Sequence, residues 1–165
     1  MVTVAPRLKT YHVTAIANSN LASTVVTTSG NHRITMDLPV KAGGGGSAAE
    51  PVEHLLAALC GCEAATAGFI ARNMEPRVFI EGMEFEVRGE RDENGAVGRP
   101  VDEDTAVPAM VQRVSGIAYL DTTASAKVLE VLERRTSERC PVADMMRRAG
   151  CIVEIKFVAR RTITD

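Results

Sequence analysis

The chain has no tryptophan, and aromatic residues make up only 4% of its 165 residues. Proteins that bind single-stranded nucleic acid stack the bases on aromatic side chains, so the sequence is poorly suited to that role. A long basic run is also missing, and the formal net charge is -2. Nucleic acids and anionic membrane surfaces recruit strongly basic proteins, and we therefore expect no nucleic acid and no membrane as a partner.

The first residues lack the basic segment and apolar core of a secretory signal. The longest mostly apolar stretch, residues 55–71, is interrupted by Glu63, and we expect it to be too short and too rich in small residues to span a bilayer. Both observations predict a cytoplasmic protein. Four cysteines in a reducing cytosol are more typical of catalysis or metal binding than of structural disulfides.

Hydrophobic residues account for 45% of the chain and charged residues for 24%, which is typical of a globular protein. The length suits one domain over residues 1–165, and no repeat or linker divides it. Alternating residues predict an antiparallel meander of three strands, over residues 11–16, 22–28 and 32–37. A flexible glycine-rich loop is expected over residues 41–49, and an exposed connection over residues 91–105. The other predicted elements are helices over residues 51–73, 125–139 and 141–148, and strands over residues 78–91, 110–120 and 151–158. The fold class predicted is therefore α+β.

The long helix predicted from residue 51 carries apolar residues on two sides. One stripe is formed by Leu55, Leu59, Cys62, Thr66 and Phe69, and the other by Leu56, Cys60, Ala64 and Ala67. A helix of this kind is buried on two sides, inside a sheet or against a partner subunit. Because Cys60 and Cys62 point in different directions, they cannot pair within the helix.

Cys140 immediately precedes Pro141, at the expected N-cap of the short helix. The free N–H groups and positive dipole at a helix N-terminus favour a thiolate at this position. Cys60 and Cys151 are expected to be small buried hydrophobic residues. Cys62 and Cys140 are the candidates for chemistry, although their positions alone assign no function.

Two segments carry a family resemblance: residues 49–62 read AEPVEHLLAALCGC and residues 139–144 read RCPVAD. The first resembles the signature of the OsmC/Ohr family, in which a proline, a carboxylate and Leu-Leu-Ala-Ala lead to a cysteine on a central helix. Its spacing selects Cys62. The second resembles the Cys-Pro-Val motif of the same family and selects Cys140. The order of the predicted elements also matches, so the resemblance, to a divergent OsmC-like branch, covers nearly the whole chain.

The resemblance implies antiparallel sheets around long central helices, in an intertwined homodimer with its sites at the interface. It also implies an enzyme, a dithiol-dependent peroxidase that reduces organic hydroperoxides, with hydrogen peroxide as a further oxidant to test. Cys62 would become a sulfenic acid and then form a disulfide with Cys140. A dithiol of the lipoyl or thioredoxin type would reduce that disulfide, and no cofactor is implied.

The chain departs from the family pattern at two supporting positions. Family peroxidases place an Arg, which stabilises the thiolate, near the early strands, but the corresponding turn here is formed by residues 18–20 and contains no Arg. Arg33 is the nearest basic candidate. The peroxidase branch also has a Glu directly after the proline, where this chain has Val52 followed by Glu53. Glu53 lies about 180° from Cys62 on a straight helix, and a first-turn carboxylate favoured by the helix dipole is the simpler interpretation.

These departures leave two alternatives open. One is a family member that has lost peroxidase activity and binds a small apolar or thiol-reactive ligand. The other is a purely structural role for both cysteines. His54, two turns before Cys62 on the expected helix, is a further candidate base.

Two other site types are set aside. The run GGGGSA, residues 43–48, contains a G-x-G-x-x-A pattern, but a dinucleotide site requires the helix to begin on the glycines. Metal binding by the cysteines and histidines is conceivable, yet the chain has no C-x-x-C or H-x-x-x-H spacing, and we expect no metal site.

Overall fold

A computed structural model describes residues 7–160 of the chain. By its internal contacts the chain divides between Leu55 and Leu56 into two compact units. Each unit is described separately below. The single domain over residues 1–165 stays a prediction, and its first six and last five residues lie outside the described part.

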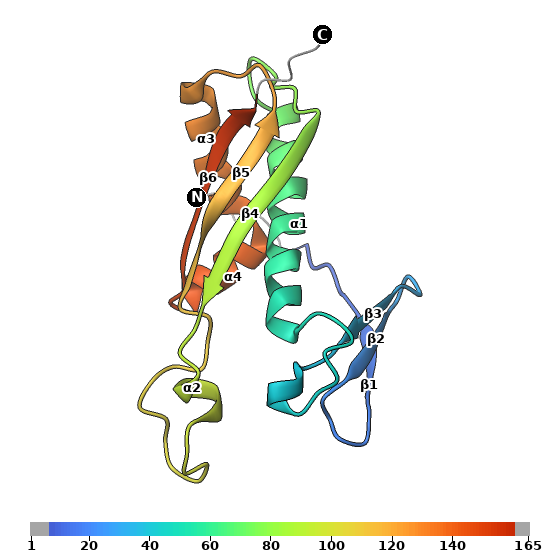
Figure 1. Ribbon diagram of the computed structural model, residues 1–165. Coiled ribbons are helices and arrows are strands. Elements are labelled where there is room, and N and C mark those ends of the chain that lie inside the picture. Colours follow the sequence, from blue (N-terminus) through green and yellow to red (C-terminus); the bar gives the residue numbers. More distant parts are fainter. Residues whose placement is uncertain (1–6, 161–165) are drawn as a thin grey trace. The chain divides into compact units, whose positions relative to one another are not determined.

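The first unit contains an antiparallel three-stranded sheet in the order β1-β2-β3 (Figure 1). Its strands are β1 (Val13–Ala17), β2 (Thr24–Thr28) and β3 (Arg33–Met36). Val13 pairs with Thr28, and Thr24 pairs with Met36. The predicted meander is confirmed, with strands one to two residues shorter at most ends because the turns begin earlier.

The glycine-rich segment after β3 is held by the buried carboxylate of Asp37. This carboxylate accepts hydrogen bonds from the backbone N–H groups of Gly45 (3.2 Å) and Ser47 (2.9 Å) and from the Ser47 hydroxyl (2.7 Å). These bonds from Ser47 hold the pKa of Asp37 below its usual range. Gly44 has no room for a side chain, since an added Cβ would lie 1.9 Å from the Leu38 carbonyl oxygen. The segment, which includes a 3₁₀ helix η1 (Val40–Ala42), is thus an anchored loop rather than the flexible one expected.

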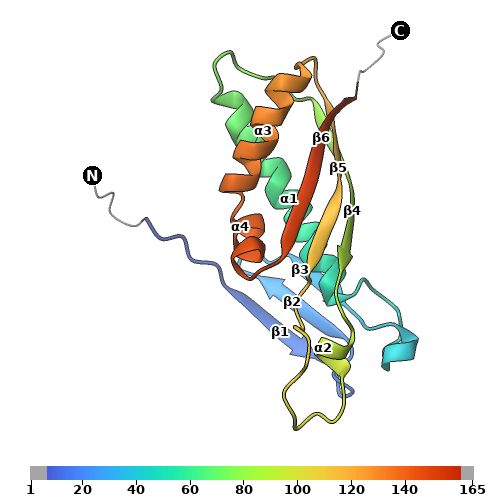
Figure 2. The same cartoon turned by 90° about the vertical axis from the view of Figure 1, so that its left-hand side faces the viewer.

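The second unit is built on a sheet of order β4-β5-β6. Its strands are β4 (Gly82–Glu90), β5 (Arg113–Asp121) and β6 (Ile152–Arg160). β4 and β5 are antiparallel, whereas β6 runs parallel to β5. Parallel neighbours need a crossover connection, and here the helices α3 (Ala126–Arg139) and α4 (Pro141–Arg148) supply it. Figure 2 shows both helices beside β6.

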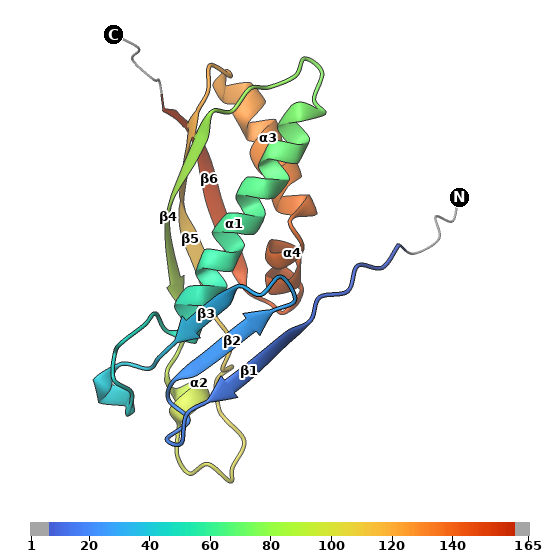
Figure 3. The same ribbon diagram turned by 90° about the vertical axis from the view of Figure 1, so that its right-hand side faces the viewer.

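The helices cover one face of this sheet, on the same side as the long helix α1 (Pro51–Arg72) (Figures 1 and 3). Strand residues facing them are apolar, and those with the lowest exposure are Val114, Ala118, Leu120, Ile155 and Phe157. In β4, half-buried Met83, Phe85 and Val87 alternate with exposed residues. The period-two pattern therefore identifies the core face of the sheet.

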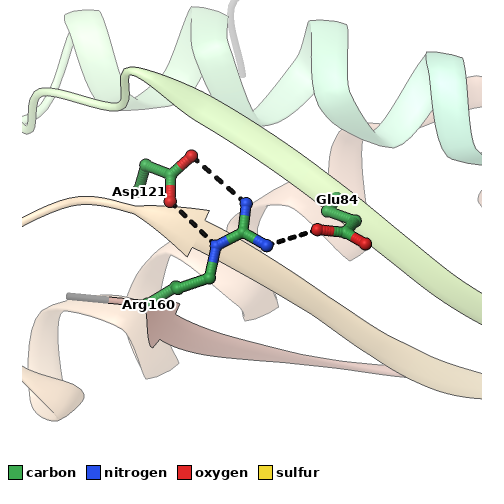
Figure 4. Close-up of polar contacts among 3 residues, drawn as sticks. All are labelled: Glu84, Asp121 and Arg160. Atoms are coloured by element: carbon green, nitrogen blue, oxygen red, sulfur yellow. Dashed lines mark hydrogen bonds and ion pairs between the residues drawn. The ribbon is translucent and has the colours of Figure 1, made fainter. Parts of the chain in front are cut away.

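The opposite face of the sheet carries ion pairs. Arg160 of β6 donates from Nε to Asp121 of β5 at 3.0 Å and also binds Glu84 of β4 (Figure 4). The bonded guanidinium lowers the pKa of Asp121. Because the groups are partly exposed, we expect these ion pairs to contribute little to the free energy of unfolding.

Helix boundaries follow the capping chemistry. Ser125 caps α3, and Gly150, in a left-handed conformation with φ of 95°, ends α4 as expected. A four-residue helix, α2 (Asn94–Val97), lies within the connection predicted to be irregular.

Residues 51–73 form a helix that is long and apolar enough to cross a membrane, judged by length and composition alone. The sequence-based expectation concerned the shorter stretch, residues 55–71, and the helix extends beyond it at both ends. The signal is weak, because core helices of globular proteins have the same composition. Glu63, near its middle, is only 3% exposed and has protein groups around it. The absence of a membrane partner stays a prediction.

Candidate functional site

The cysteines selected by the two motifs both belong to the second unit. Cys62 is half-buried on α1, and Cys140 is fully buried between α3 and α4. Cys140 is the N-cap of α4, and its sulfur accepts a hydrogen bond from the Ala143 backbone N–H at 3.5 Å. The N-cap position predicted from Pro141 is confirmed.

The two thiols are close enough for Cys62 to raise the pKa of Cys140, although they are far apart in the sequence. Both are free. Adjacent thiols of unequal exposure are what a peroxidatic and a resolving cysteine require, because the oxidant must reach only one of them. Their catalytic roles stay predictions at this point.

The expected thiolate at Cys140 is wrong. Burial raises the pKa of Cys140 to about 12, and the hydrogen bond with Cys62 and the charge of Glu63 act in the same direction. The Ala143 N–H favours the thiolate, as the N-cap position implies, but burial outweighs it. A pKa this high favours the protonated thiol of Cys140 at neutral pH.

Glu63 is a third member of the site that the sequence-based analysis did not include. It follows Cys62 directly on α1, is 3% exposed, and lies close enough to the Cys140 thiol for that group to lower its pKa. Burial raises the pKa of Glu63, and the contact with Cys140 and the positive charge of Arg147 partly offset this effect. The signal in the sequence was a carboxylate that interrupts an apolar stretch, which we had used only as evidence against a membrane span.

Arg147 of α4 supplies the positive charge that lowers the pKa of Glu63. Its guanidinium is fixed by Ser137 of α3, since Nη1 donates to the Ser137 hydroxyl at 2.5 Å and Nη2 donates to the Ser137 carbonyl. Both residues also line an open groove of about 790 Å³ beside β6. Nothing in the sequence pattern distinguished Arg147 from the other arginines of its segment.

The remaining predicted site residues belong to the first unit. The Glu53 carboxylate accepts a hydrogen bond from the Glu50 backbone N–H at 2.8 Å, so it caps the start of α1. His54 Nε2 contacts the Thr35 carbonyl oxygen at 3.0 Å. Arg33 is exposed at the start of β3 and lines a separate hollow of the first sheet. The site roles of Glu53 and Arg33 stay predictions.

The other two cysteines differ from the pair. Cys151 is buried at the start of β6 and Cys60 is half-buried on α1, and burial raises the pKa of both thiols. Within residues 7–160 no group of three His, Cys, Asp or Glu side chains is placed to hold a metal ion.

The fold matches solved structures over most of its length. An OsmC-like protein from Mycoplasma pneumoniae is 21% identical, with a TM-score of 0.73 over 92% of this chain and 97% of that one. An organic hydroperoxide resistance protein OsmC from Legionella pneumophila is 19% identical, with a TM-score of 0.63 over 93% and 98%. The organic hydroperoxide resistance protein OhrB of Bacillus subtilis is 17% identical, with a TM-score of 0.61 over 93% and 100%. These likenesses confirm the predicted α+β, OsmC-like fold.

Comparison with curated protein sequences found no match. Residues 44–156, more than half of the chain, match the sequence profile of the family described as OsmC-like protein. This range includes both motifs and all three members of the site. The chain therefore belongs to the OsmC-like protein family.

Proposed function

We propose that this protein is a dithiol-dependent peroxidase that reduces organic hydroperoxides through Cys62 and Cys140. The observation that carries the proposal is the adjacency of a half-buried and a fully buried thiol in one unit, with the proton held by the buried one. Two structural neighbours are named organic hydroperoxide resistance proteins, which supports an organic hydroperoxide as the oxidant.

The reaction has three steps. The Cys62 thiolate attacks the distal oxygen of the hydroperoxide, the O–O bond breaks, and the alkoxide leaves and takes up a proton as the alcohol. Cys62 is thereby oxidised to a sulfenic acid. The Cys140 sulfur then displaces the sulfenic hydroxyl, giving a Cys62–Cys140 disulfide and water. A dithiol of the lipoyl or thioredoxin type reduces the disulfide by exchange and is itself oxidised. The protein is proposed to act as a cytoplasmic homodimer, without cofactor or metal.

The test is a thiol count on the reduced protein before and after one equivalent of cumene hydroperoxide, with peptide mapping. We expect a loss of two thiols and a mapped Cys62–Cys140 bridge, and neither in Cys62→Ser. The matched control is Cys151→Ser, which removes a buried thiol outside the pair and should still form the bridge. Hydrogen peroxide in place of cumene hydroperoxide tests the second oxidant.

Four intact thiols at excess peroxide would exclude the enzyme and favour the second candidate, a ligand-binding family member. One observation supports that alternative. Family peroxidases carry an Arg in the turn that contains Asn18 in this chain. The Asn18 side-chain oxygen accepts hydrogen bonds from the backbone N–H groups of Ala22 and Ser23, each at 3.1 Å. This turn is therefore closed by an uncharged side chain.

A further inference from the structure

Glu63 is a buried ionisable group that the three steps above do not use. It lies on the inner side of α1 in line with Leu59 and Ala67, at the four-residue spacing of a helical stripe. These two neighbours are completely buried and Glu63 is 3% exposed. A carboxylate in such a stripe costs stability unless it is paired or hydrogen bonded, so its position requires a physical reason.

The groups that face Glu63 come from three helices. Cys60 and Cys62 belong to its own helix, Glu133 lies on α3, and α4 contributes Cys140 and Arg147. Arg147 is hydrogen bonded to Ser137 and forms no salt bridge with Glu63 in the described part of the chain. Among the described residues the carboxyl has no structural ion pair, and of its neighbours Cys140 has the largest lowering effect on its pKa.

The resolving step needs a proton acceptor at this place. With a pKa of about 12, on the order of one Cys140 thiol in 10⁵ is ionised at pH 7, and the thiolate is the nucleophile in disulfide formation. A buried carboxyl with a raised pKa is matched to this task, because general-base efficiency is greatest when the pKa approaches the working pH.

We propose that Glu63 is a catalytic residue that accepts the Cys140 proton during disulfide formation, an inference that rests on the proposed peroxidase function. The Cys140 S–H proton passes to the Glu63 carboxylate, and the Cys140 sulfur attacks the Cys62 sulfenic sulfur. The S–O bond breaks, and the departing hydroxide takes the proton from Glu63 and leaves as water. Cys62 sulfenic acid and Cys140 thiol are converted to disulfide and water, Glu63 is regenerated, and no outside oxidant or reductant is needed.

The experiment separates the two chemical steps in the full-length protein. Reduced protein is mixed with one equivalent of cumene hydroperoxide and quenched at intervals, and dimedone-labelled Cys62 and the Cys62–Cys140 disulfide are quantified by peptide mapping. In Glu63→Gln we expect sulfenic acid to form at the wild-type rate and the disulfide to form about 100-fold more slowly. Glu130→Gln, an exposed carboxylate of α3, is the matched control and should resolve like the wild type. Circular dichroism of each variant verifies folding.

Disulfide formation in folded Glu63→Gln at the wild-type rate would overturn the inference while leaving the peroxidase proposal intact. Wild-type protein that yields neither labelled Cys62 nor disulfide would overturn both. Should the Gln variant not fold, the pH profile of the resolving step in the wild type decides. A rate that rises with pH through an apparent pKa above the ordinary 4.5 of glutamate supports the inference, and a rate independent of pH between 4 and 8 contradicts it.

Discussion

Buried carboxyl groups make the stability of a protein depend on pH, and Glu63 is such a group at the centre of the candidate site. Its folded-state pKa is raised by burial, so the folded protein holds a proton that the unfolded chain releases near the ordinary value of 4.5. The resulting contribution to stability is complete below pH 4.5 and is lost as the pH rises through the raised pKa. Wild-type protein therefore becomes less stable as the pH rises above 4.5.

Glu63→Gln removes the carboxyl charge while keeping the shape of the side chain. We expect the free energies of unfolding of variant and wild type to differ little at pH 4, and the variant to gain relative stability as the pH rises from 4.5 through the raised pKa of Glu63. Urea denaturation at several pH values measures the difference, with Glu130→Gln as the exposed control. A gap that stays constant across this range would mean that Glu63 does not titrate there.

Local surroundings also make the two candidate cysteines, Cys62 and Cys140, unequal in burial. Cys140 is fully buried at an N-cap, where the favourable Ala143 N–H is outweighed by the loss of water around the sulfur. Cys62 lies on a different helix, α1, and is half-buried. Under the proposed function, the half-buried thiol is the one that the oxidant reaches, and the buried thiol is protected until Cys62 has reacted.

At the scale of elements, the anchored loop of the first unit depends on one side chain. The Asp37 carboxylate accepts hydrogen bonds from the backbone N–H groups of Gly45 and Ser47, two loop residues outside any helix or strand. We expect Asp37→Ala to raise the hydrogen-exchange rates of these two amides by about tenfold, because local opening no longer breaks a hydrogen bond. Asp92→Ala, which removes the bond to the Asn94 N–H in a different loop, is the matched control. Unchanged exchange at Gly45 and Ser47 would show that the loop is held by its backbone alone.

Most elements could be predicted from the sequence because they carry strong periodicity or capping residues. The short helix begins at Pro141 and ends at Arg148 as predicted, and α1 ends at Arg72, one residue before its predicted end. The elements α2 and η1 were missed, since four and three residues are too few for a periodic pattern. The parallel pairing of β5 and β6 was also missed, because alternation along a strand contains no information about the direction of its neighbour.

The candidate site was only partly predictable for a related reason. Cys62 and Cys140 were found because each lies in a recognisable motif. The contacts of Glu63 with Cys140, and its proximity to Arg147, depend on how α1 packs against α3 and α4. No spacing within a single helix encodes such a contact, and Glu63 therefore stood out in the sequence only as an interruption of an apolar stretch.

At the scale of the whole molecule, α1 carries small and apolar residues that are exposed within the described residues 7–160. The exposed members on this helix are Ala57, Ala58, Gly61, Ala65 and Phe69. Phe69 is 52% exposed, although its apolar ring favours burial. The proposed homodimer would cover this surface with a second copy.

Sedimentation equilibrium tests this assembly. We expect the wild type to sediment at twice the 17.7 kDa mass of one chain, and Phe69→Asp to weaken dimerisation at least about tenfold by placing a charge in an apolar interface. Val101→Asp, at an 86% exposed residue outside the helix, serves as the control and should leave the mass unchanged. A monomeric wild type at micromolar concentration would contradict the proposed dimer.

The boundary between the two units falls inside α1, between Leu55 and Leu56, and not in a linker. Domain dissection is therefore unsuited to this protein. A fragment starting at residue 56 would begin in mid-helix, without Pro51 and without the Glu53 carboxylate that caps the helix. Such a fragment would retain both reactive thiols but would expose unpaired backbone N–H groups one to two turns from Cys62. Gene fusions, truncations and split reporters should accordingly be designed around the intact helix, with junctions at the chain ends or in the exposed connection between β4 and β5.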